Sequence, residues 1–593
     1  MKSELQHQVT AALNKLIALG AFPASALPEI QLERTRGARH GDFSTNIAMV
    51  LAKAARLHPR QLADRIVAAL PASGIVDRVE IAGPGFINFH LKPSAFQEVV
   101  TQVLEAGADY GCDRSKRHGK ILVEFVSANP TGPMHVGHGR GAAYGDSLCN
   151  ILAATGWDVY REYYINDAGR QADILTVSVW LRYLERCGEQ VPVPQRGYPG
   201  DYIKLSADKL YARYSNSFCH SAATLLNGLP VEPVAAEGAG DAERGEIKAQ
   251  QEAYVDALIQ RARSLLGSGF DTVQRLALDD QLTEIRATLQ AFGVRFDEWC
   301  SEKSLIKSGS VKTAIDRLNA AGHVYDKDGA RWLRTSVFGD EKDRVLFKAD
   351  GTATYFANDL AYHINKLDRG FPLLVDVWGA DHHGYVARVL AAIEALTGRK
   401  DVLSVQLVQF VTLCSGRMGK RSGNFVTLKD LVTEAGKDAA RFFYLLRSHD
   451  QHLEFDIDLA KSERSDNPVY YVQYAHARIC SVFRQLQERG LTWDKWRGKS
   501  QLHGLSEPQE RALLESLSRY PEVVDMAANH CEPHQLAHYL MDVASNFHVY
   551  YNAHKFLTAG EQLRDARLNL CAATRQVLQN GLALLGVSAP EVM

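Results

Sequence analysis

The strongest constraint on the fold is a strand, a loop rich in proline and glycine, a helix and a second strand in close succession. Residues 120–126 predict a strand, residues 137–154 a helix closed by Gly156, and residues 157–165 a second strand. This succession is typical of a doubly wound parallel sheet, in which ligands bind where the strands end. We therefore expect the chemistry to lie in the loop that follows Val126.

That loop carries two histidines, His135 and His138, three positions apart. Both rings are expected on one face of a helix start, where free N–H groups and the positive end of the dipole attract phosphate. Gly137 and Gly139 leave room for a ligand. A metal pair is disfavoured because the glutamate of H-E-x-x-H and a third ligand are missing, and buried core histidines would not explain the glycines. The pattern predicts hydrogen bonds to phosphoryl oxygens.

A second cationic segment, residues 415–424, follows a predicted strand at residues 405–410. It mixes Arg417, Lys420 and Arg421 with small residues, which is typical of a mobile loop that closes over a polyphosphate. Lys420 would be the point charge on the leaving group. An exposed turn is the alternative for this segment taken alone.

Composition places the chain among ordinary globular proteins of several domains. Its 593 residues include 67 Lys+Arg and 69 Asp+Glu, so any site for a polyanion must be local. Its 9 cysteines are dispersed, which favours a reducing compartment and argues against a zinc ribbon or a disulfide framework. We find neither a signal-peptide pattern nor an apolar run that could span a bilayer. These features predict a soluble, cytoplasmic protein.

The chain divides into three predicted units. Residues 1–115 form an α+β unit, residues 116–465 hold the parallel sheet, and residues 466–593 form an all-helical unit. An irregular insertion at about residues 185–265 separates the two halves of the sheet. The first unit shows helical patterns at residues 5–19 and 43–70 and strands at 79–81 and 86–89, while strand-like segments of the second resume at 345–347, 373–378 and 405–410. The cationic residues 34–40 are either a solvated face or a phosphate contact.

Longer motifs resemble the arginyl-tRNA synthetase family, bacterial type, among the class I aminoacyl-tRNA synthetases. H-V-G-H at 135–138 is similar to the class I signature H-x-G-H, and R-M-G-K at 417–420 stands where K-M-S-K belongs. E-F-V-S-A-N-P-T-G-P at 124–133, Y-I-N-D-A-G-R-Q at 164–171 and W-G-A-D-H-H-G-Y at 378–385 carry the arginyl resemblance. It extends over essentially the whole chain.

The resemblance implies an α/β fold with three domains. The catalytic domain would be a doubly wound, Rossmann-like (HUP-type) parallel sheet with an insertion. An α+β N-terminal additional domain would touch the tRNA elbow, and an all-α C-terminal domain would bind the anticodon. The implied reaction joins ATP and L-arginine into arginyl-adenylate and transfers the arginyl group to the terminal adenosine 2′-hydroxyl of tRNA(Arg). Mg²⁺ would accompany ATP, and no protein-bound zinc or other metal site is expected. A monomer is the family default.

The resemblance also assigns residues to four roles. The catalytic residues would be His135, His138 and Lys420. ATP would be bound by Pro130, Thr131, Gly137, Gly139, Gly379, Asp381, Met418 and Arg417. Arginine would be bound by Glu124, Asn129, Tyr355 and Asp359, because a guanidinium requires a carboxylate that can pair with it bidentately. tRNA would be bound by Arg36, Arg39, Tyr471, Tyr474 and Arg478.

Several alternatives stay open at this stage. Arg417 and Gly419 depart from the K-M-S-K signature, which puts the details of loop closure in doubt. Asp359 could be a solvated acid on a helix surface. A noncatalytic tRNA-binding paralogue would not need His135 and His138, and cysteinyl specificity would need a zinc-bound thiol pocket that dispersed cysteines do not supply. We expect no editing domain, because a pocket of charged hydrogen bonds rejects neutral analogues strongly. Activation of the amino acid is expected to require tRNA.

Overall fold

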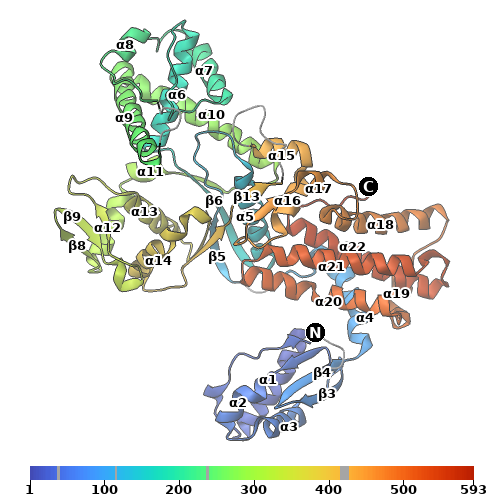
Figure 1. The fold of residues 1–593 in the computed structure, drawn as a ribbon. Helices are drawn as coiled ribbons and strands as arrows, with labels where there is room; N and C mark the ends of the chain where they lie inside the picture. Colours follow the sequence, from blue (N-terminus) through green and yellow to red (C-terminus); the bar gives the residue numbers. More distant parts are fainter. Residues whose placement is uncertain (36–39, 114–116, 235–239, 415–425) are drawn as a thin grey trace.

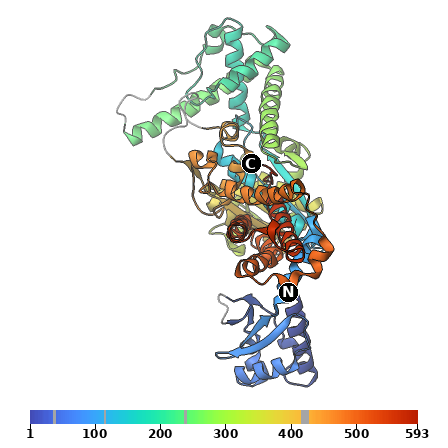
Figure 2. The same cartoon turned by 90° about the vertical axis from the view of Figure 1, so that its right-hand side faces the viewer.

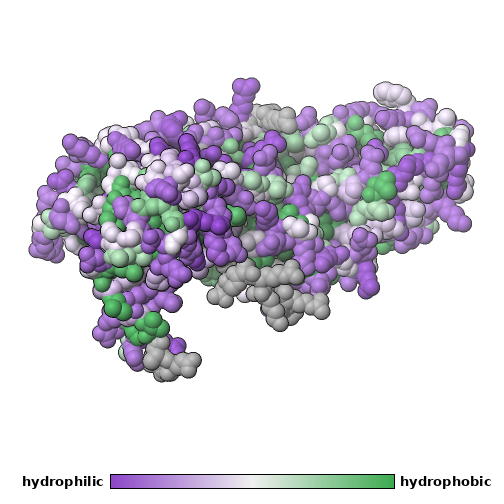
Figure 3. All heavy atoms as spheres, turned by 90° about the horizontal axis from the view of Figure 1, so that it is seen from above, coloured by the Kyte–Doolittle hydropathy of each residue, from purple (hydrophilic) through white to green (hydrophobic). Residues whose placement is uncertain are grey.

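The computed structural model describes residues 1–35, 40–113, 117–234, 240–414 and 426–593. The molecule is elongated: a small N-terminal unit lies at one end and a helical insertion at the other (Figures 1 and 2). The parallel sheet and the C-terminal helices lie between them. The face seen in Figure 3 is predominantly hydrophilic, with hydrophobic residues in small scattered groups. No helix in the described ranges is both long and apolar enough to cross a membrane.

The N-terminal unit is an antiparallel sheet covered by helices. Its strands run in the order β1-β2-β4-β3. Its elements are α1 (Lys2–Ala18), β1 (Glu33–Arg34), β2 (Phe43–Thr45), α2 (Ile47–Ala55), α3 (Pro59–Ala69), β3 (Val76–Ala82), β4 (Phe86–Leu91) and α4 (Pro93–Ala106). The predicted helical pattern over residues 43–70 is wrong at its start, because Phe43 to Thr45 pair with β4 as a strand. Arg56 ends α2 in the left-handed conformation, so two helices replace one.

The central sheet is parallel, as predicted. Among the described residues, its strands run in the order β12-β11-β5-β6-β7. They are β5 (Gly119–Glu124), β6 (Trp157–Ile165), β7 (Glu298–Ser301), β11 (Leu373–Gly379) and β12 (Leu403–Val408). The chain builds outward from β5 to β7 and then returns to β11 on the other side of β5, so the strand order switches beside β5. A ligand crevice is expected at that switch.

The prediction that residues 345–347 continue the sheet is wrong. They form β10 (Arg344–Phe347) of a separate antiparallel sheet with β8 (Val324–Lys327) and β9 (Ala330–Leu333). A short apolar run does not reveal which sheet a strand will join. Around the two sheets lie α11 (Glu302–Lys307), α12 (Ser310–Ala320), α13 (Tyr355–Asp368) and α14 (His383–Thr397).

The insertion is more regular than its sequence suggests. It is a helical module of α6 (Arg170–Arg186), α7 (Asp201–Tyr214), α8 (Ala222–Leu226), α9 (Asp241–Leu266) and α10 (Gly269–Ala291). One buried cluster from Ala172 to Leu278 holds it together, so α6 and α10 are part of it. The dispersed cysteines argued against disulfides, but Cys187 and Cys219 form one in this module. Helix packing brings together two residues that are 32 positions apart.

The C-terminal unit is all helical, as predicted. It consists of α18 (Pro468–Glu488), α19 (Lys495–Ser500), α20 (Pro508–Asn529), α21 (Pro533–Ala553) and α22 (Glu561–Leu584). The connection from the sheet contains β13 (Val411–Leu413), α15 (Leu428–Ala435), α16 (Lys437–Leu445), β14 (Leu453–Phe455) and α17 (Ile457–Lys461). The N-terminal unit contacts the C-terminal helices: Arg34 forms an ion pair with Glu522 of α20 at 2.8 Å. This residue of the cationic segment thus contacts protein rather than solvent.

Candidate functional site

The loop after β5 begins with unusual backbone geometry. Val126 and Ser127 both have positive φ angles, 69° and 39°. Such conformations cost energy for residues other than glycine and cluster at functional sites. The Ser127 hydroxyl donates to Glu124 Oε1 at 2.8 Å and accepts from the Tyr164 amide at 3.1 Å. These bonds tie the turn that follows β5 to the neighbouring strand β6, at the predicted edge of the sheet.

The two predicted histidines cap the first helix of this sheet, α5 (Val136–Ala154). His135 Nδ1 accepts from the Gly137 amide at 3.1 Å, and His138 Nδ1 accepts from the His135 amide at 3.3 Å. The ring centroids lie 3.7 Å apart. Burial lowers the pKa of His138 to about 3, with a further contribution from His135, and burial also lowers the pKa of His135. Both rings are therefore neutral at pH 7, with the proton on Nε2 available to a ligand.

The two glycines of this motif, Gly137 and Gly139, are required by local packing. A Cβ at Gly137 would lie 2.9 Å from Cε1 of the His135 ring. Gly139 is buried, and a Cβ there would lie 2.6 Å from Leu428 Cδ1 and 2.9 Å from the Tyr444 hydroxyl. The need for glycine at position 139 therefore comes from close packing of α5 against α15 and α16.

The second predicted loop lies mostly outside the described residues. Arg417, Met418 and Lys420 belong to the undescribed range 415–425. The chain that resumes after it is bound to the histidine loop, because the Val136 amide donates to the Val426 carbonyl at 3.2 Å and the Leu428 amide donates to the Met134 carbonyl at 2.8 Å. The segment that follows the undescribed range is thus a neighbour of the histidine loop.

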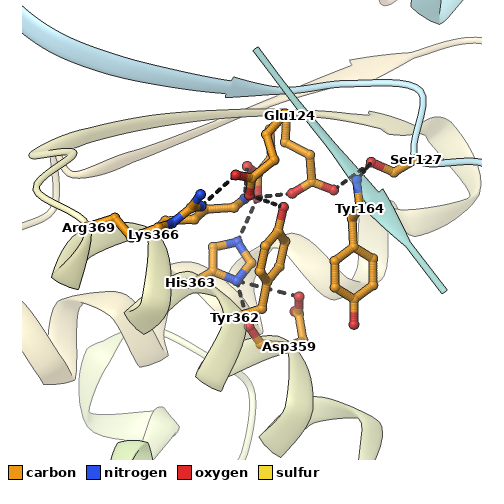
Figure 4. A network of polar contacts seen from close by, with 10 residues as sticks. Glu124, Ser127, Tyr164, Asp359, Tyr362, His363, Lys366 and Arg369 are labelled. Carbon is orange, nitrogen blue, oxygen red and sulfur yellow. Dashed lines mark hydrogen bonds and ion pairs between the residues drawn. The ribbon is translucent and has the colours of Figure 1, made fainter. Parts of the chain in front are cut away.

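A chain of alternating charges connects β5, β11 and α13, where β11 pairs with β5 (Figure 4). Lys366 Nζ donates to Glu124 Oε2 at 2.6 Å and to Asp376 Oδ1 at 2.9 Å. His363 Nε2 lies 2.6 Å from Asp376 Oδ2, and its Nδ1 lies 3.4 Å from Asp359 Oδ1. We call Glu124, Lys366, Asp376, His363 and Asp359 the buried charge chain. Burial alone would lower the pKa of His363, but Asp359 and Asp376 raise it to about 9.

Asp359 is the most exposed member of this chain. Its side chain is 26% exposed, so it is not a solvated acid on a helix surface. No hydrogen bond of ordinary geometry reaches its buried Oδ2 atom among the described residues, although the Tyr385 hydroxyl lies near enough to lower the pKa of this carboxyl. Burial raises the pKa of this carboxyl, while His363 opposes that shift. Tyr355, one helical turn earlier and 76% exposed, points away from the core. An unpartnered buried oxygen of this kind fits a donor supplied by a ligand.

Sequence reasoning missed a second buried carboxylate, Glu302 at the start of α11. It is 6% exposed, and burial raises its pKa. Its Oε1 accepts from Asn358 at 3.5 Å. In the orientation that satisfies its neighbours, the Asn166 amide donates to Glu302 Oε2 at 2.9 Å. The available signal was an acid directly after strand β7, but that strand was not predicted.

The remaining predicted ATP and arginine residues surround the same edge. Asn129 is exposed and Pro130 buried in the turn before the histidines, where the Thr131 amide donates to the Asn129 carbonyl at 2.8 Å. Gly379 ends β11, and the exposed Asp381 follows it. The insertion also reaches this loop, since a Cβ at Gly132 would lie 2.9 Å from the Tyr202 hydroxyl.

The predicted tRNA-binding residues fall into two groups. Arg36 and Arg39 lie outside the described residues. Tyr471, Tyr474 and Arg478 form a half-buried cluster on α18. The Arg478 guanidinium lies 4.7 Å from the Tyr474 ring centroid and 4.5 Å from that of Tyr551 on α21. Stacked aromatic rings with an arginine are a surface that nucleotide bases can extend.

Among the described residues, no group of three or more His, Cys, Asp or Glu side chains could hold a metal ion.

Five parallel strands with an H-x-G-H helix start at the central crossover define the catalytic domain of a class I aminoacyl-tRNA synthetase. Residues 99–195 and 241–452 match the family described as tRNA synthetases class I (R), catalytic domain. Residues 3–91 match the arginyl tRNA synthetase N terminal domain, and residues 472–593 match the DALR anticodon binding domain. The chain belongs to the arginine–tRNA ligase family.

Individual relatives agree with this membership over the full length. An arginine–tRNA ligase of Thioalkalivibrio sulfidiphilus is 52% identical over 598 residues, and one of Legionella pneumophila 51%, each with 100% of both chains covered. Thermus thermophilus arginyl-tRNA synthetase has a similar structure, with a TM-score of 0.75, 25% identity and 100% of both chains covered. The predicted fold class and family are confirmed.

Proposed function

We propose that this chain attaches L-arginine to tRNA(Arg) in two steps, through an arginyl-adenylate made from ATP. Two features at one edge of the sheet carry the proposal. One is the neutral pair of donors, His135 and His138, and the other is the half-buried carboxylate of Asp359, whose Oδ2 atom is unpartnered. The first suits phosphate and the second suits a guanidinium. A noncatalytic tRNA-binding paralogue would require neither arrangement.

At the nucleotide end, His135 and His138 would donate from Nε2 to the α-phosphate as charge builds up during attack by the arginine carboxylate. The α5 N-terminus adds its dipole. Gly137, Gly139, Pro130 and Thr131 stay predicted parts of the ATP site, as do Gly379 and Asp381 for the ribose. Lys420, with Arg417 and Met418, stays the predicted element for the β- and γ-phosphates. Mg²⁺ would arrive bound to the nucleotide phosphates.

At the arginine end, Asp359 would accept the guanidinium, with Tyr355 beside it. The position and burial of Glu302 support a role as a second acceptor. Glu124 and Asn129, on the loop side, would hold the α-amino group. Glu124 retains acceptor capacity for this, since a carboxylate offers about four lone-pair sites, and its hydrogen bonds to the serine hydroxyl and the buried lysine use only part of them.

The other units supply the tRNA contacts in this proposal. Residues 1–115 would touch the elbow, with Arg36 and Arg39, and residues 466–593 would bind the anticodon, with Tyr471, Tyr474 and Arg478. Residues 116–465 would carry catalysis. We further propose a cytoplasmic monomer. The free thiols Cys149, Cys300, Cys414, Cys480, Cys531 and Cys571 favour a reducing compartment, whereas the disulfide between Cys187 and Cys219 does not.

A charging panel tests the function directly. The purified protein is incubated with bulk tRNA, ATP and each amino acid in turn, and acylated tRNA is measured. We expect charging with arginine alone. Charging with a different amino acid, or none with any, would overturn the proposal. ATP–pyrophosphate exchange with arginine is then measured with and without tRNA, and equal rates would remove the expectation that activation needs tRNA.

A further inference from the structure

His363 has acceptors at both of its ring nitrogens. Nε2 lies 2.6 Å from Asp376 Oδ2, and Nδ1 lies 2.8 Å from the backbone carbonyl oxygen of Asp359. A carbonyl oxygen can only accept a hydrogen bond, so Nδ1 must carry a proton. Asp376 is fully buried between His363 and Lys366, and these two cations hold its pKa below the ordinary range although burial alone would raise it. Its carboxylate therefore also accepts, and Nε2 carries a proton as well.

With a proton on each nitrogen, His363 is an imidazolium in a ring that is 1% exposed. It is too buried to reach a ligand directly, and the adjacent Asp359 is the more exposed of the two (Figure 4). The same nitrogen that binds the Asp359 carbonyl lies 3.4 Å from Asp359 Oδ1, so one proton faces both the backbone and the carboxylate of that residue. The other carboxylate oxygen, Oδ2, keeps its unpartnered position.

We propose that His363 is a positioning residue for substrate recognition: the imidazolium, anchored to β11 through Asp376, holds the Asp359 carboxylate ionised and aimed at the guanidinium of arginine. The proposal deepens the proposed function and rests on it. It assigns His363 a part in selecting a cationic amino acid, without contact to that substrate. Lys366 anchors Glu124 to the same Asp376, so one buried acid fixes carboxylates at both ends of the predicted arginine site.

Several ionisable groups face Asp359 besides His363. They are Lys366 on its own helix, Asp376 on β11, Tyr385 on α14, Tyr164 on β6 and Glu302 on α11. Lys366 is paired with Glu124 and Asp376, whereas His363 forms an ion pair with Asp359 itself. Loss of the imidazolium should therefore raise the pKa of Asp359, since burial would then act with less opposition.

Two neutral substitutions test this. His363→Gln can keep a donor toward Asp376, and His363→Asn can keep one toward the Asp359 carbonyl; both remove the charge. For each we expect the KM for arginine in tRNA charging to rise about tenfold or more, with the KM for ATP and for tRNA changed less than about twofold. The acid limb of kcat/KM for arginine, followed between about pH 5 and about pH 8, should move to higher pH.

A matched variant separates positioning from lost packing. Ile364→Ala changes the next residue of α13, which is 3% exposed and packs in the core without a charge. It should lower the thermal midpoint yet leave the acid limb in place. The inference is overturned if both His363 variants behave like Ile364→Ala, or if the KM values of all three substrates rise together. If neither His363 variant folds, Asp376→Asn, which removes the acceptor that anchors the imidazolium, must show the same shifts or the inference fails.

These outcomes are distinct from failure of the proposed function. If the unchanged protein does not charge tRNA with arginine, both fail. If it does, and Asp359→Asn loses arginine binding while His363→Gln and His363→Asn do not, only the role of His363 is wrong.

Discussion

Two sites at the same edge of the catalytic sheet handle charge in opposite ways. At the start of α5, the histidine pair is neutral, because each Nδ1 accepts a backbone N–H and burial lowers the pKa of both rings. Around β11 and α13, the buried charge chain is linked by short hydrogen bonds and ion pairs, and its cations oppose the rise that burial causes in the pKa of Glu124 and Asp359. The β5 strand and its loop belong to both.

The difference matches the timing of charge in the proposed reaction. A guanidinium is charged before it binds, so a fixed carboxylate stabilises it in the ground state and provides selectivity. Charge on the α-phosphate increases only in the transition state. Neutral hydrogen-bond donors therefore bind the transition state more strongly than the ground state. The comparison predicts that substitutions at one site affect a different substrate from substitutions at the other.

The largest effect is expected for Asp359→Asn. The variant keeps the shape of the side chain but removes the charge that would pair with the guanidinium, so kcat/KM for arginine should fall by about 10²- to 10³-fold. The KM for ATP should stay close to that of the unchanged protein. Asp368→Asn, at an exposed acid of the same helix that pairs with Arg317, is the control and should have no effect. Equal losses in both variants would refute the assignment of Asp359.

His138→Ala should have the second largest effect. The rate of adenylate formation is expected to fall by about 10²-fold, the loss seen when one donor to a developing oxyanion is removed. Affinity for tRNA, measured by direct binding, should be nearly unchanged. Because His138 also caps α5, the control is His58→Ala: His58 Nδ1 accepts from the Arg60 amide at the start of α3, far from the site. A similar loss of activity in the control would trace the effect to helix capping.

Gly139→Ala tests the packing behind the histidine pair. The new methyl group would meet Leu428 and Tyr444, so we expect about 1–3 kcal/mol of lost stability. Gly141→Ala is a matched control on the same helix, because a Cβ at that position would have no packing neighbour within 4 Å. That variant should be neutral or more stable, since alanine favours a helix. The measurement is the thermal midpoint of each variant, and equal destabilisation by the two substitutions would contradict the packing argument.

Much of the fold could be predicted from local sequence patterns. The strand at residues 157–165 and the α5 helix were predicted because their periodicity and flanking glycine depend on near neighbours. The boundary at Phe43 to Thr45 and the sheet membership of residues 345–347 were not, because strand pairing is decided by distant segments.

The site divides in the same way. His135 and His138 stand in a compact motif whose spacing has a meaning of its own. Glu302, His363 and Asp376 come from α11, α13 and β11, and each is an ordinary residue in its local sequence. The topology, which returns the chain from β7 to the other side of β5, places His363 and Asp376 near Glu124, whereas Glu302 follows β7 directly. The disulfide between Cys187 and Cys219 escaped prediction for the same reason.

The smallest expected effect is a difference in pH dependence between the two sites. Burial raises the pKa of Asp359 and of Glu302, and a carboxyl must lose its proton to bind a guanidinium. As the pH falls, kcat/KM for arginine should therefore decline, by at most about tenfold per pH unit for one proton. The histidine pair should not titrate in the same range, because its pKa values are lowered. kcat/KM for ATP, measured at saturating arginine, should thus stay flat through about pH 6.5, where an ordinary histidine would titrate. A bend in the ATP profile there would mean that the histidines carry charge in the working enzyme, and the contrast between neutral donors and fixed charges would no longer hold.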